Sequence, residues 1–373
     1  MKIGIVGGGQ LGRMVTQEAI KMNYNVIVLD PTPDCPAKKA GAKQIVGSLT
    51  DSEKIHKLAK QVDVLTFEIE HIDTKTLKAL EAEGGIVHPS PHSLEIIKDK
   101  LTQKKSLQKY DIPTAPFHEV KNEQDIHDLS KKIGFPFLLK SRYGGYDGRG
   151  NFFVSKPEDI PEAIKTLGID KVYIEEYVPF QKELAVMVAR GSDGMIHSYP
   201  VVETIHKDNI LHFTLTPAPI ESSIQENARN LARSVMKHLG GYGVFGIEMF
   251  LTKDNKILIN EIAPRVHNSG HYTIDACHTS QFKQHLLAIT GQPLQTPAMK
   301  VKAAVMVNIL GDRIGRANPV GLSKVKKLPG ITVHIYGKLQ TKPQRKMGHI
   351  TVVGERLEEC LRLAKKAREM VTI

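Results

Sequence analysis

The sequence predicts a protein of mixed α/β and α+β class, built from a parallel sheet, a small α+β unit and a larger, mainly antiparallel sheet. Three observations support this prediction. The 373 residues exceed what one hydrophobic core usually serves. Near the start, short apolar segments alternate with helical patterns, as in parallel sheets. Farther along, long runs alternate apolar and polar residues, as in antiparallel sheets.

The first part, residues 1–95, has the pattern of a Rossmann-like domain. A strand, a helix and a further strand repeat in order, which favours a parallel sheet covered by helices. The expected elements are a strand at 2–6, a helix from about Gln10, a strand at 25–30, a helix from about Asp51, a strand at 62–67, a helix from about Asp73 and a strand at 85–88.

A linker helix and a small lid are expected over residues 96–180. A lysine-rich helical stretch over 93–110 leads into prolines that end it. Between Pro116 and Val178 the pattern predicts strand, helix, strand, glycine loop, strand, helix and strand. The third part, 181–373, then holds the antiparallel sheet with packed helices, and its longest alternating runs lie at 183–190, 243–251 and 256–262.

Composition narrows the class of protein. The net charge of +11 indicates either lysines spread over solvated faces or a positive field that attracts anionic small molecules such as nucleotides. The chain has no Trp and no recognisable reader motif, so no nucleic-acid partner is expected. No apolar run is long enough for a membrane span, and no signal peptide is expected. Three widely separated cysteines favour a reducing cytoplasm.

A glycine-rich turn follows the first expected strand. Gly7-Gly8-Gly9-Gln10-Leu11-Gly12 matches GxGxxG, and Asp30 ends the next strand, as in dinucleotide-binding folds. The same glycines also suit any tight strand-to-helix turn. A structural turn, a contact to a phosphate or other substrate group, and a dinucleotide site all remain open.

A second glycine-rich segment lies between two apolar strands, over residues 137–154. It reads as a hairpin rather than a strand-to-helix phosphate loop. Glycines let backbone N–H groups approach phosphate oxygens, and Lys140 at the end of the first strand adds a positive charge. A phosphate cover is therefore favoured over a flexible hairpin tip.

Two glutamates are predicted to face each other across a hairpin over 246–261. With Asp254 and Asn255 at the turn, antiparallel partners must have numbers that sum to 509, which pairs Glu248 with Glu261. Opposed carboxylates repel, so a cation should lie between them. Magnesium, which prefers oxygen ligands, is the expected ion, and Asn260 offers a further oxygen to the metal or a contact to phosphate.

The segment Glu175-Glu176-Tyr177-Val178 ends a strand and leads into Pro179, with Glu183 soon after. A segment that passes from a strand into a linker leaves a backbone N–H and C=O unpaired, and these groups can bond to the edge of an adenine ring. A carboxylate there can accept hydrogen bonds from ribose hydroxyls.

Together these pieces resemble the ATP-grasp superfamily in order and spacing. Within it, the motifs Gly7–Gly12, Tyr143–Gly150, His267–His271, His334–Lys338 and Arg345–His349 are similar to those of carboxyaminoimidazole ribonucleotide synthetases, and the resemblance extends from residue 2 to about 353. Lys100 and Val266 depart from the residues that this family more often has, which are Arg and Pro. Lys100 keeps the charge without the planar fork of Arg.

The resemblance implies an ATP-dependent ligase that carboxylates aminoimidazole ribonucleotide with bicarbonate, through carboxyphosphate. It implies Mg²⁺, with Mn²⁺ as an alternative, at Glu248 and Glu261, catalytic roles for Lys140, Asp147 and Arg265, and a homodimer. The implied nucleotide contacts are Lys100, Lys140, Gly145, Tyr146, Asp147, Gly148, Arg149, Gly150, Asn151, Glu175, Glu176, Tyr177, Val178, Glu183, His206, Asn260 and Glu261. The implied ribonucleotide contacts are Tyr146, Asp147, Arg149, Arg265, His267, Asn268, Lys338 and Arg345, the last two nearest the 5′-phosphate.

Three other functions compete with this interpretation. Another ATP-grasp ligase, such as a formate-dependent glycinamide ribonucleotide transformylase, would share the nucleotide residues. A nicotinamide-dependent oxidoreductase would use the GxGxxG turn but leaves the glutamate hairpin unexplained. A non-catalytic nucleotide-binding protein would bind ATP without turnover.

Overall fold

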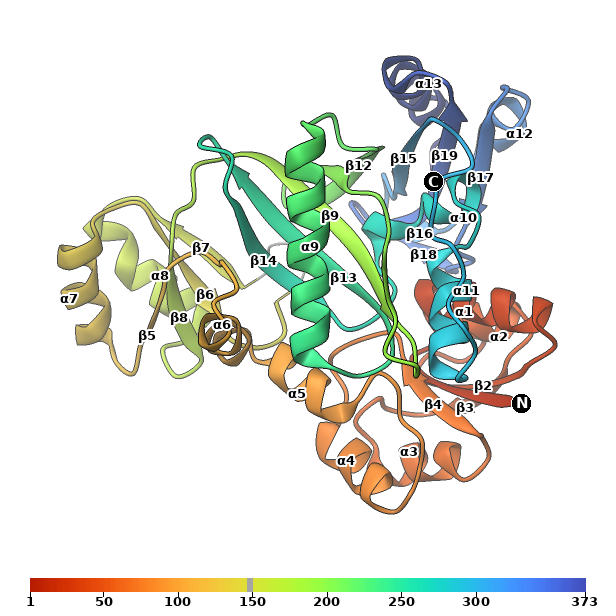
Figure 1. The fold of residues 1–373 in the computed structure, drawn as a ribbon, viewed down its shortest axis with the longest axis horizontal. Coiled ribbons are helices and arrows are strands. Elements are labelled where there is room, and N and C mark those ends of the chain that lie inside the picture. Colours follow the sequence, from red (N-terminus) through yellow and green to blue (C-terminus); the bar gives the residue numbers. More distant parts are fainter. Residues whose placement is uncertain (146–149) are drawn as a thin grey trace.

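The computed structural model describes residues 1–145 and 150–373. Figure 1 shows a small sheet with α7 and α8 at one end of the molecule, a large sheet crossed by α9 in the middle, and the N-terminal sheet packed beside α11. The mixed class predicted from sequence is therefore confirmed. Among the described residues, no helix combines the length and the apolar character that crossing a membrane would require.

The N-terminal sheet is parallel, with strand order β3-β2-β1-β4. Its elements are β1 (Lys2–Val6), α1 (Gln10–Lys21), β2 (Asn25–Asp30), α2 (Pro36–Lys39), β3 (Lys43–Val46), α3 (Ser52–Ala59), β4 (Val64–Phe67) and α4 (Thr74–Ala82). The predicted strand at 85–88 is wrong, since only Val87 forms an isolated bridge, to Leu65. Neither α2 nor β3 was expected from the sequence. Both span only four residues, too few to show a period.

The lysine-rich stretch forms two helices rather than one, α5 (Pro91–Lys98) and α6 (Lys100–Lys109). Asp99 between them has extended backbone angles, φ −101° and ψ 105°. Its carboxylate accepts from the backbone N–H groups of Leu101 at 3.1 Å and Thr102 at 3.3 Å. One helix ends and the next begins here because the Asp99 side chain caps α6. It accepts from backbone N–H groups that would otherwise lack hydrogen-bond partners.

The small sheet has the element order predicted for a lid. It is antiparallel, with strand order β5-β8-β6-β7. Its elements are β5 (Phe117–Glu119), α7 (Glu123–Ile133), β6 (Phe137–Ser141), β7 (Asn151–Val154), the 3-10 turn η1 (Pro157–Asp159), α8 (Ile160–Leu167) and β8 (Val172–Glu176). Apolar faces of α7 and α8 cover one side of the sheet and form a separate core.

The large sheet has nine strands, in the order β14-β13-β9-β11-β12-β15-β19-β17 with β10 beside β9, and every pairing is antiparallel as predicted. Its strands are β9 (Phe180–Arg190), β10 (Ile196–Ser198), β11 (Val202–Lys207), β12 (Ile210–Thr216), β13 (Gly243–Thr252), β14 (Ile257–Ala263), β15 (Ala303–Leu310), β17 (Ile331–Ile335) and β19 (Lys346–Gly354). A short ribbon, β16 (Gly315–Arg316) with β18 (Gln340–Thr341), lies apart.

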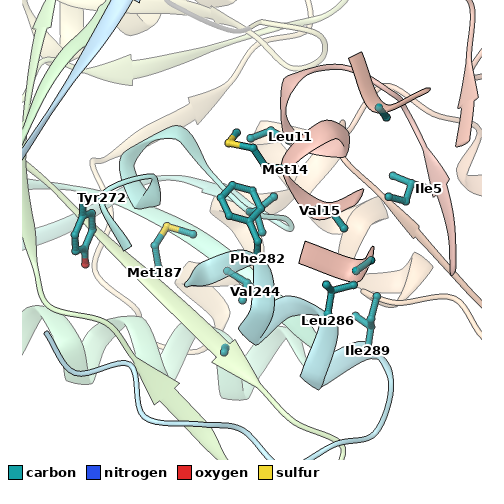
Figure 2. Close-up of a cluster of buried hydrophobic side chains, with 14 of the residues drawn as sticks. Ile5, Leu11, Met14, Val15, Met187, Val244, Tyr272, Phe282, Leu286 and Ile289 are labelled. Atoms are coloured by element: carbon teal, nitrogen blue, oxygen red, sulfur yellow. The ribbon is translucent and has the colours of Figure 1, made fainter. Parts of the chain in front are cut away.

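Helices cover the large sheet and join it to the N-terminal part. They are α9 (Ser222–Leu239), the 3-10 turn η2 (Asn268–Gly270), α10 (Thr273–Ala276), α11 (Gln281–Ile289), α12 (Leu322–Val325) and α13 (Leu357–Glu369). Figure 2 shows α1 side chains, among them Met14 and Val15, beside Phe282 and Leu286 of α11. One core thus contains residues of both the N-terminal part and α11. The division at residues 95 and 180 stays a prediction.

Candidate active site

The two predicted glutamates do face each other, Glu248 on β13 and Glu261 on β14. Burial raises the pKa of Glu248 to about 7, and the negative charge of Glu261 adds to this shift. Burial and the like charge of Glu261 both favour the protonated form of Glu248, and a cation bound between the two carboxylates would favour the ionised form. Hard oxygen donors of this kind suit Mg²⁺, so the pair fits the expected ion.

A bulge in β14 creates this pairing. Near the turn, Met249 pairs with Ile259. The register shifts between Met249 and Glu248, so the partner of Glu248 is Glu261 and not Asn260. Near the turn, the numbers of paired residues therefore sum to one less than the predicted 509. The extra residue Asn260 then restores the predicted pair of Glu248 and Glu261. Bulges of this kind redirect side chains at functional sites.

Positive and neutral groups surround the glutamate pair. Lys100 Nζ lies 3.2 Å from Glu261 Oε1, and His267 Nε2 lies 3.7 Å from Glu248 Oε1. Burial lowers the pKa of His267 well below its usual value, and the positive charge of Arg265 lowers it further. His267 is therefore neutral, and it can donate or accept a hydrogen bond but does not neutralise Glu248.

Glu183 on β9 and His206 on β11 form a second pair at this site, with His206 Nδ1 2.6 Å from Glu183 Oε2. Burial by itself would lower the pKa of His206. The hydrogen bond and negative charge of Glu183 outweigh that effect, and the charge of Glu248 adds to them, so the pKa is raised. Both residues were predicted from sequence, and the structure brings them to the glutamate pair.

A buried ion triad lies where α6 meets the small sheet. Glu175 Oε1 is 3.0 Å from Lys140 Nζ, and Glu175 Oε2 is 2.7 Å from Lys104 Nζ. The side chains of Glu175 and Lys104 are only 1% and 2% exposed. Although burial opposes ionisation, the two ammonium groups hold the pKa of Glu175 down at about 2. The triad therefore fixes Lys140 beside the glycine-rich hairpin.

Lys104 also ties the triad to the large sheet. Its ammonium group donates to Thr114 Oγ1 at 2.6 Å and to the Ile259 carbonyl at 3.4 Å, and Thr114 Oγ1 donates to the same carbonyl at 2.8 Å. Lys104 thus contacts Glu175 of β8, which also binds Lys140, and Ile259 of β14, the strand that carries Glu261. It links both halves of the candidate site.

The linker between β8 and β9 holds the remaining predicted nucleotide contacts. Glu176 Oε1 is 2.9 Å from His118 Nε2, Tyr177 is exposed and Val178 is buried. The backbone N–H of Glu176 donates to Pro116 O, and the N–H of Phe180 donates to Val178 O. Residues 177–179 belong to no strand and form the linker that the sequence predicted.

The glycine-rich hairpin is formed by β6 and β7, with Lys140 opposite Asn151. The predicted residues Gly145, Gly150 and Asn151 lie at its base, whereas Tyr146, Asp147, Gly148 and Arg149 lie outside the described residues. Just before the loop, Tyr143 and Arg142 both bond to Asp99, and Arg142 does so with two nitrogens. The start of the loop is thereby attached to the break between α5 and α6.

The segment after β14 carries the predicted ribonucleotide contacts. Arg265 Nη2 lies 2.9 Å from Glu70 Oε1 in the N-terminal part. The buried amides of Asn268 and Asn308 exchange two hydrogen bonds, at 2.8 and 3.1 Å, and Asn308 also donates to the Leu211 carbonyl at 2.8 Å. Asn268 is therefore held in one orientation by a neighbour on β15.

Lys338 connects the C-terminal part to the glycine-rich turn. Its ammonium group donates to Gln10 Oε1 at 2.8 Å and to the Lys346 carbonyl at 2.6 Å. Arg345 precedes Lys346, and its guanidinium donates to the Gln340 carbonyl at 2.7 Å. Both predicted phosphate contacts thus lie on neighbouring segments, and Lys338 reaches the first residue of α1.

The GxGxxG turn is occupied by carboxylates of the protein itself. Glu68 accepts from the backbone N–H groups of Gly9 and Gly12, and Asp30 accepts from that of Gly8 at 2.8 Å. A Cβ at Gly12 would lie 2.7 Å from the carbonyl of the first glycine of the turn. These donors are the ones that a dinucleotide pyrophosphate would need. The structure therefore favours a structural turn.

Sequence reasoning missed several residues of the site, including Lys104, Glu68 and Asn308. The burial of Lys104 could have been predicted from its spacing. Leu101, Lys104 and Leu107 are three residues apart and therefore share one face of α6, which is buried. No such spacing marks Glu68 and Asn308, since their partners are 56 and 40 residues away.

The chain matches three family models in order, a ribonucleotide synthetase preATP-grasp domain over residues 1–98, an ATP-grasp domain over 105–282 and a phosphoribosylaminoimidazole carboxylase C-terminal domain over 304–363. With the lid, the glycine-rich hairpin and the opposed glutamates, these matches define an ATP-grasp protein.

Whole-chain relatives give the family. An N5-carboxyaminoimidazole ribonucleotide synthase of Staphylococcus haemolyticus is 38% identical, covering 96% of this chain and 94% of that protein. The crystal structure of such a synthetase from Thermotoga maritima has 47% identity and a TM-score of 0.90, covering 100% and 98% of the two chains. The chain belongs to the N5-carboxyaminoimidazole ribonucleotide synthase family. It is also 44% identical to a phosphoribosylaminoimidazole carboxylase of Schizosaccharomyces pombe, and spans 66% of the length of that protein.

Proposed function

We propose that this protein carboxylates 5-aminoimidazole ribonucleotide on its amine, with ATP and bicarbonate, in purine biosynthesis. The observation that carries the proposal is the opposition of Glu248 and Glu261, with Lys100 and His267 beside them. This pair is proposed to hold the metal ion that accompanies ATP, and its contact with His267 lies beside the proposed ribonucleotide segment 265–268. A related structure from Aspergillus clavatus, 38% identical with a TM-score of 0.91 over 99% of this chain and 98% of that one, is described as a complex with ADP and the aminoimidazole ribonucleotide.

The nucleotide is proposed to lie between the small sheet and the large one. Its adenine would pair with the backbone of the 177–179 linker, and Glu183 would accept from the ribose hydroxyls. Lys140 and the amides of the glycine-rich hairpin would bind the phosphates. In this arrangement Lys140 exchanges part of its contact with Glu175 for phosphate, and Glu175 keeps Lys104 as its counter-ion.

Glu248, Glu261 and Asn260 are the residues proposed to hold Mg²⁺, or Mn²⁺ in its place. Bound there, the ion would neutralise charge on the transferring phosphate. Lys100 would then leave Glu261, its 3.2 Å partner, for the nucleotide.

The ribonucleotide is proposed to lie against Arg265, His267 and Asn268, with its 5′-phosphate at Lys338 and Arg345. Arg and Lys both suit a phosphate, and the fork of Arg can contact two of its oxygens. Glu70, which holds Arg265 at 2.9 Å, would keep the guanidinium in place. Tyr146, Asp147 and Arg149 complete the proposed contacts.

In the proposed reaction, a bicarbonate oxygen attacks the γ-phosphorus of ATP, releasing ADP and forming carboxyphosphate. The amine nitrogen then bonds to the carboxyl carbon, inorganic phosphate leaves and the nitrogen loses a proton. Asp147 is proposed to orient the amine or accept this proton. Lys140 and Arg265 stabilise the negative charge that develops on the reacting groups. Closure of the small sheet would exclude water from the labile intermediate.

The direct test measures ADP release from MgATP and bicarbonate, with and without the ribonucleotide, while ribonucleotide consumption is followed. We expect ADP release that depends on the ribonucleotide and matches its consumption. Turnover stimulated instead by glycinamide ribonucleotide with formate would identify another ATP-grasp ligase. ATP binding without turnover would identify a non-catalytic protein.

Replacing Asn308 with alanine should raise the KM for the ribonucleotide by about tenfold, because Asn268 loses the amide that orients it. The KM for ATP should stay unchanged. Ile309→Ala is the matched control, since Ile309 is also fully buried on β15 but points into the core on the other face of the sheet. That variant should lose about 2–4 kcal/mol of stability without the change in KM. Equal KM values for both variants would contradict the assignment.

We also propose a cytoplasmic location and a homodimer. The three cysteines are buried and unpaired, which suits a reducing compartment. The homodimer rests on the family resemblance. Sedimentation velocity at several protein concentrations tests it directly.

A further inference from the structure

A cluster of imidazole and carboxylate side chains lies beside the segment that carries Lys338. His334 on β17 and His349 on β19 are direct cross-strand partners, and their rings stack with centroids 4.5 Å apart. Asp275, from α10, lies over the same strands, with its Oδ2 2.9 Å from His334 Nε2. One potential ligand atom from each of these three residues lies within 4.8 Å of the other two. Helix α10 and the two strands β17 and β19 therefore bring metal-ligand groups together.

His349 is held as metal-ligating histidines usually are. Its Nδ1 lies 2.9 Å from the hydroxyl of Tyr336, while its Nε2 is buried and has no hydrogen-bond partner among the described residues. Leaving a buried polar atom without a hydrogen-bond partner is energetically unfavourable. The hydrogen bond between Tyr336 and His349 Nδ1 fixes the orientation of the ring and leaves Nε2 available to a metal ion.

The neighbouring His271 does not belong to the ligand set. The amide N–H of Gln281 donates to its Nδ1 at 3.0 Å, and the same amide is fixed by two hydrogen bonds to the backbone of His267. Because its Nδ1 accepts, the proton of the neutral ring is at Nε2. The ligand atoms that lie together belong to Asp275, His334 and His349 and not to His271, so the cluster offers three ligands. A metal ion there would displace the proton through which His334 Nε2 contacts Asp275.

We propose that Asp275, His334 and His349 bind a first-row transition-metal ion of the Zn²⁺ class. Two imidazoles and one carboxylate suit such an ion, whereas Mg²⁺ prefers oxygen ligands alone. Ligand atoms on a tetrahedral Zn²⁺ lie about 3.4 Å apart. The contact between Asp275 and His334 then opens by about 0.5 Å, and the widest gap closes by at most about 1.4 Å. Side-chain rotations can supply both changes.

The site would join α10 to β17 and β19 close to the proposed phosphate contacts. Lys338 follows His334 by four residues, and Arg345 precedes His349 by four. Binding there would stabilise the folded chain through mass action, whether or not the protein turns over ATP. The proposal is therefore independent of the proposed function.

The test titrates the metal-stripped full-length protein with Co²⁺, and separately with Zn²⁺, in excess Mg²⁺ that occupies the glutamate pair. We expect one Co²⁺ per chain with the visible absorption of a four- or five-coordinate site, and a higher melting temperature with Zn²⁺. His334→Gln and Asp275→Asn, both at partly exposed positions, should each weaken binding at least about tenfold and abolish the thermal shift. His127→Gln, which removes an exposed histidine beside Glu123, is the matched control and should bind as the wild type does.

Two results would overturn the proposal. One is a wild-type protein that retains no Co²⁺ or Zn²⁺ after gel filtration and shows no thermal shift; the cluster is then a hydrogen-bonded network. The other is equal binding by the wild type and all three variants, which places the ion on surface histidines.

Discussion

Glu248→Gln should lower ATP turnover by about a thousandfold and at the same time stabilise the nucleotide-free protein. Turnover falls because the proposed metal ion loses one of its two carboxylate ligands. This ion would stabilise the negative charge that develops on the transferring phosphate in the transition state. Stability rises because glutamine keeps the shape of the side chain but removes a partly buried charge that faces Glu261. A residue that reduces stability while supporting turnover is typical of a functional site.

The stabilisation should depend on pH in a defined direction. The pKa of Glu248 is raised to about 7 in the folded state, above its ordinary value of 4.5, because of burial and the charge of Glu261. Between these values the folded state binds more protons than the unfolded state, so wild-type stability falls as pH rises through this range. The variant lacks this loss, and its advantage should be small at pH 5 and on the order of 2 kcal/mol at pH 8.

Urea unfolding at the two pH values, in EDTA and without nucleotide, measures this difference. Glu203→Gln is the matched control, because Glu203 also lies on the large sheet but has a partner, Lys182, 2.7 Å away. That variant should be less stable than the wild type at both pH values. A Glu248→Gln protein with the same stability as the wild type at pH 8 would show that the glutamates do not repel each other.

Replacing Lys104 with methionine should cost about 3–5 kcal/mol of stability, whereas Lys105→Met should cost less than about 1 kcal/mol. Both lysines lie on α6, and both have a carboxylate oxygen at 2.7 Å. Lys104 and its partner are buried, while Lys105 and Glu119 are 50% and 42% exposed. Removal of Lys104 leaves a buried carboxylate with one counter-ion, but water replaces Lys105 at little cost.

The Lys104 variant should also weaken ATP binding, because Glu175 then retains Lys140 as its only counter-ion and opposes its transfer to phosphate. Urea unfolding and ATP titration of both variants measure the two effects. Glu175→Gln in the Lys104→Met background should restore part of the lost stability by removing the unpaired charge. Equal costs at positions 104 and 105 would mean that the buried pair contributes no more than the surface pair.

Much of the fold could be predicted because its elements carry local signals. Alternation with a period of two identified β9, β13 and β14, and the strand-helix alternation identified the N-terminal sheet. Caps at Asp51 and Asp73 marked where α3 and α4 begin. Prediction failed where the sequence pattern was short or ambiguous. The strand β3 has only four residues, and Asp99 is compatible both with one long helix and with a cap between two helices.

The candidate site was predictable only as far as its chemistry lies in contiguous motifs. The sequence alone determined the glycine-rich hairpin, the linker and the presence of two glutamates in one hairpin, because each depends on residues close together in the chain. The tertiary structure decided that a bulge at Asn260 brings the glutamates opposite, that Lys104 is buried with Glu175, and that Glu68 occupies the GxGxxG turn. Burial and charge pairing depend on groups brought together from distant positions, and local patterns carry no record of those partners.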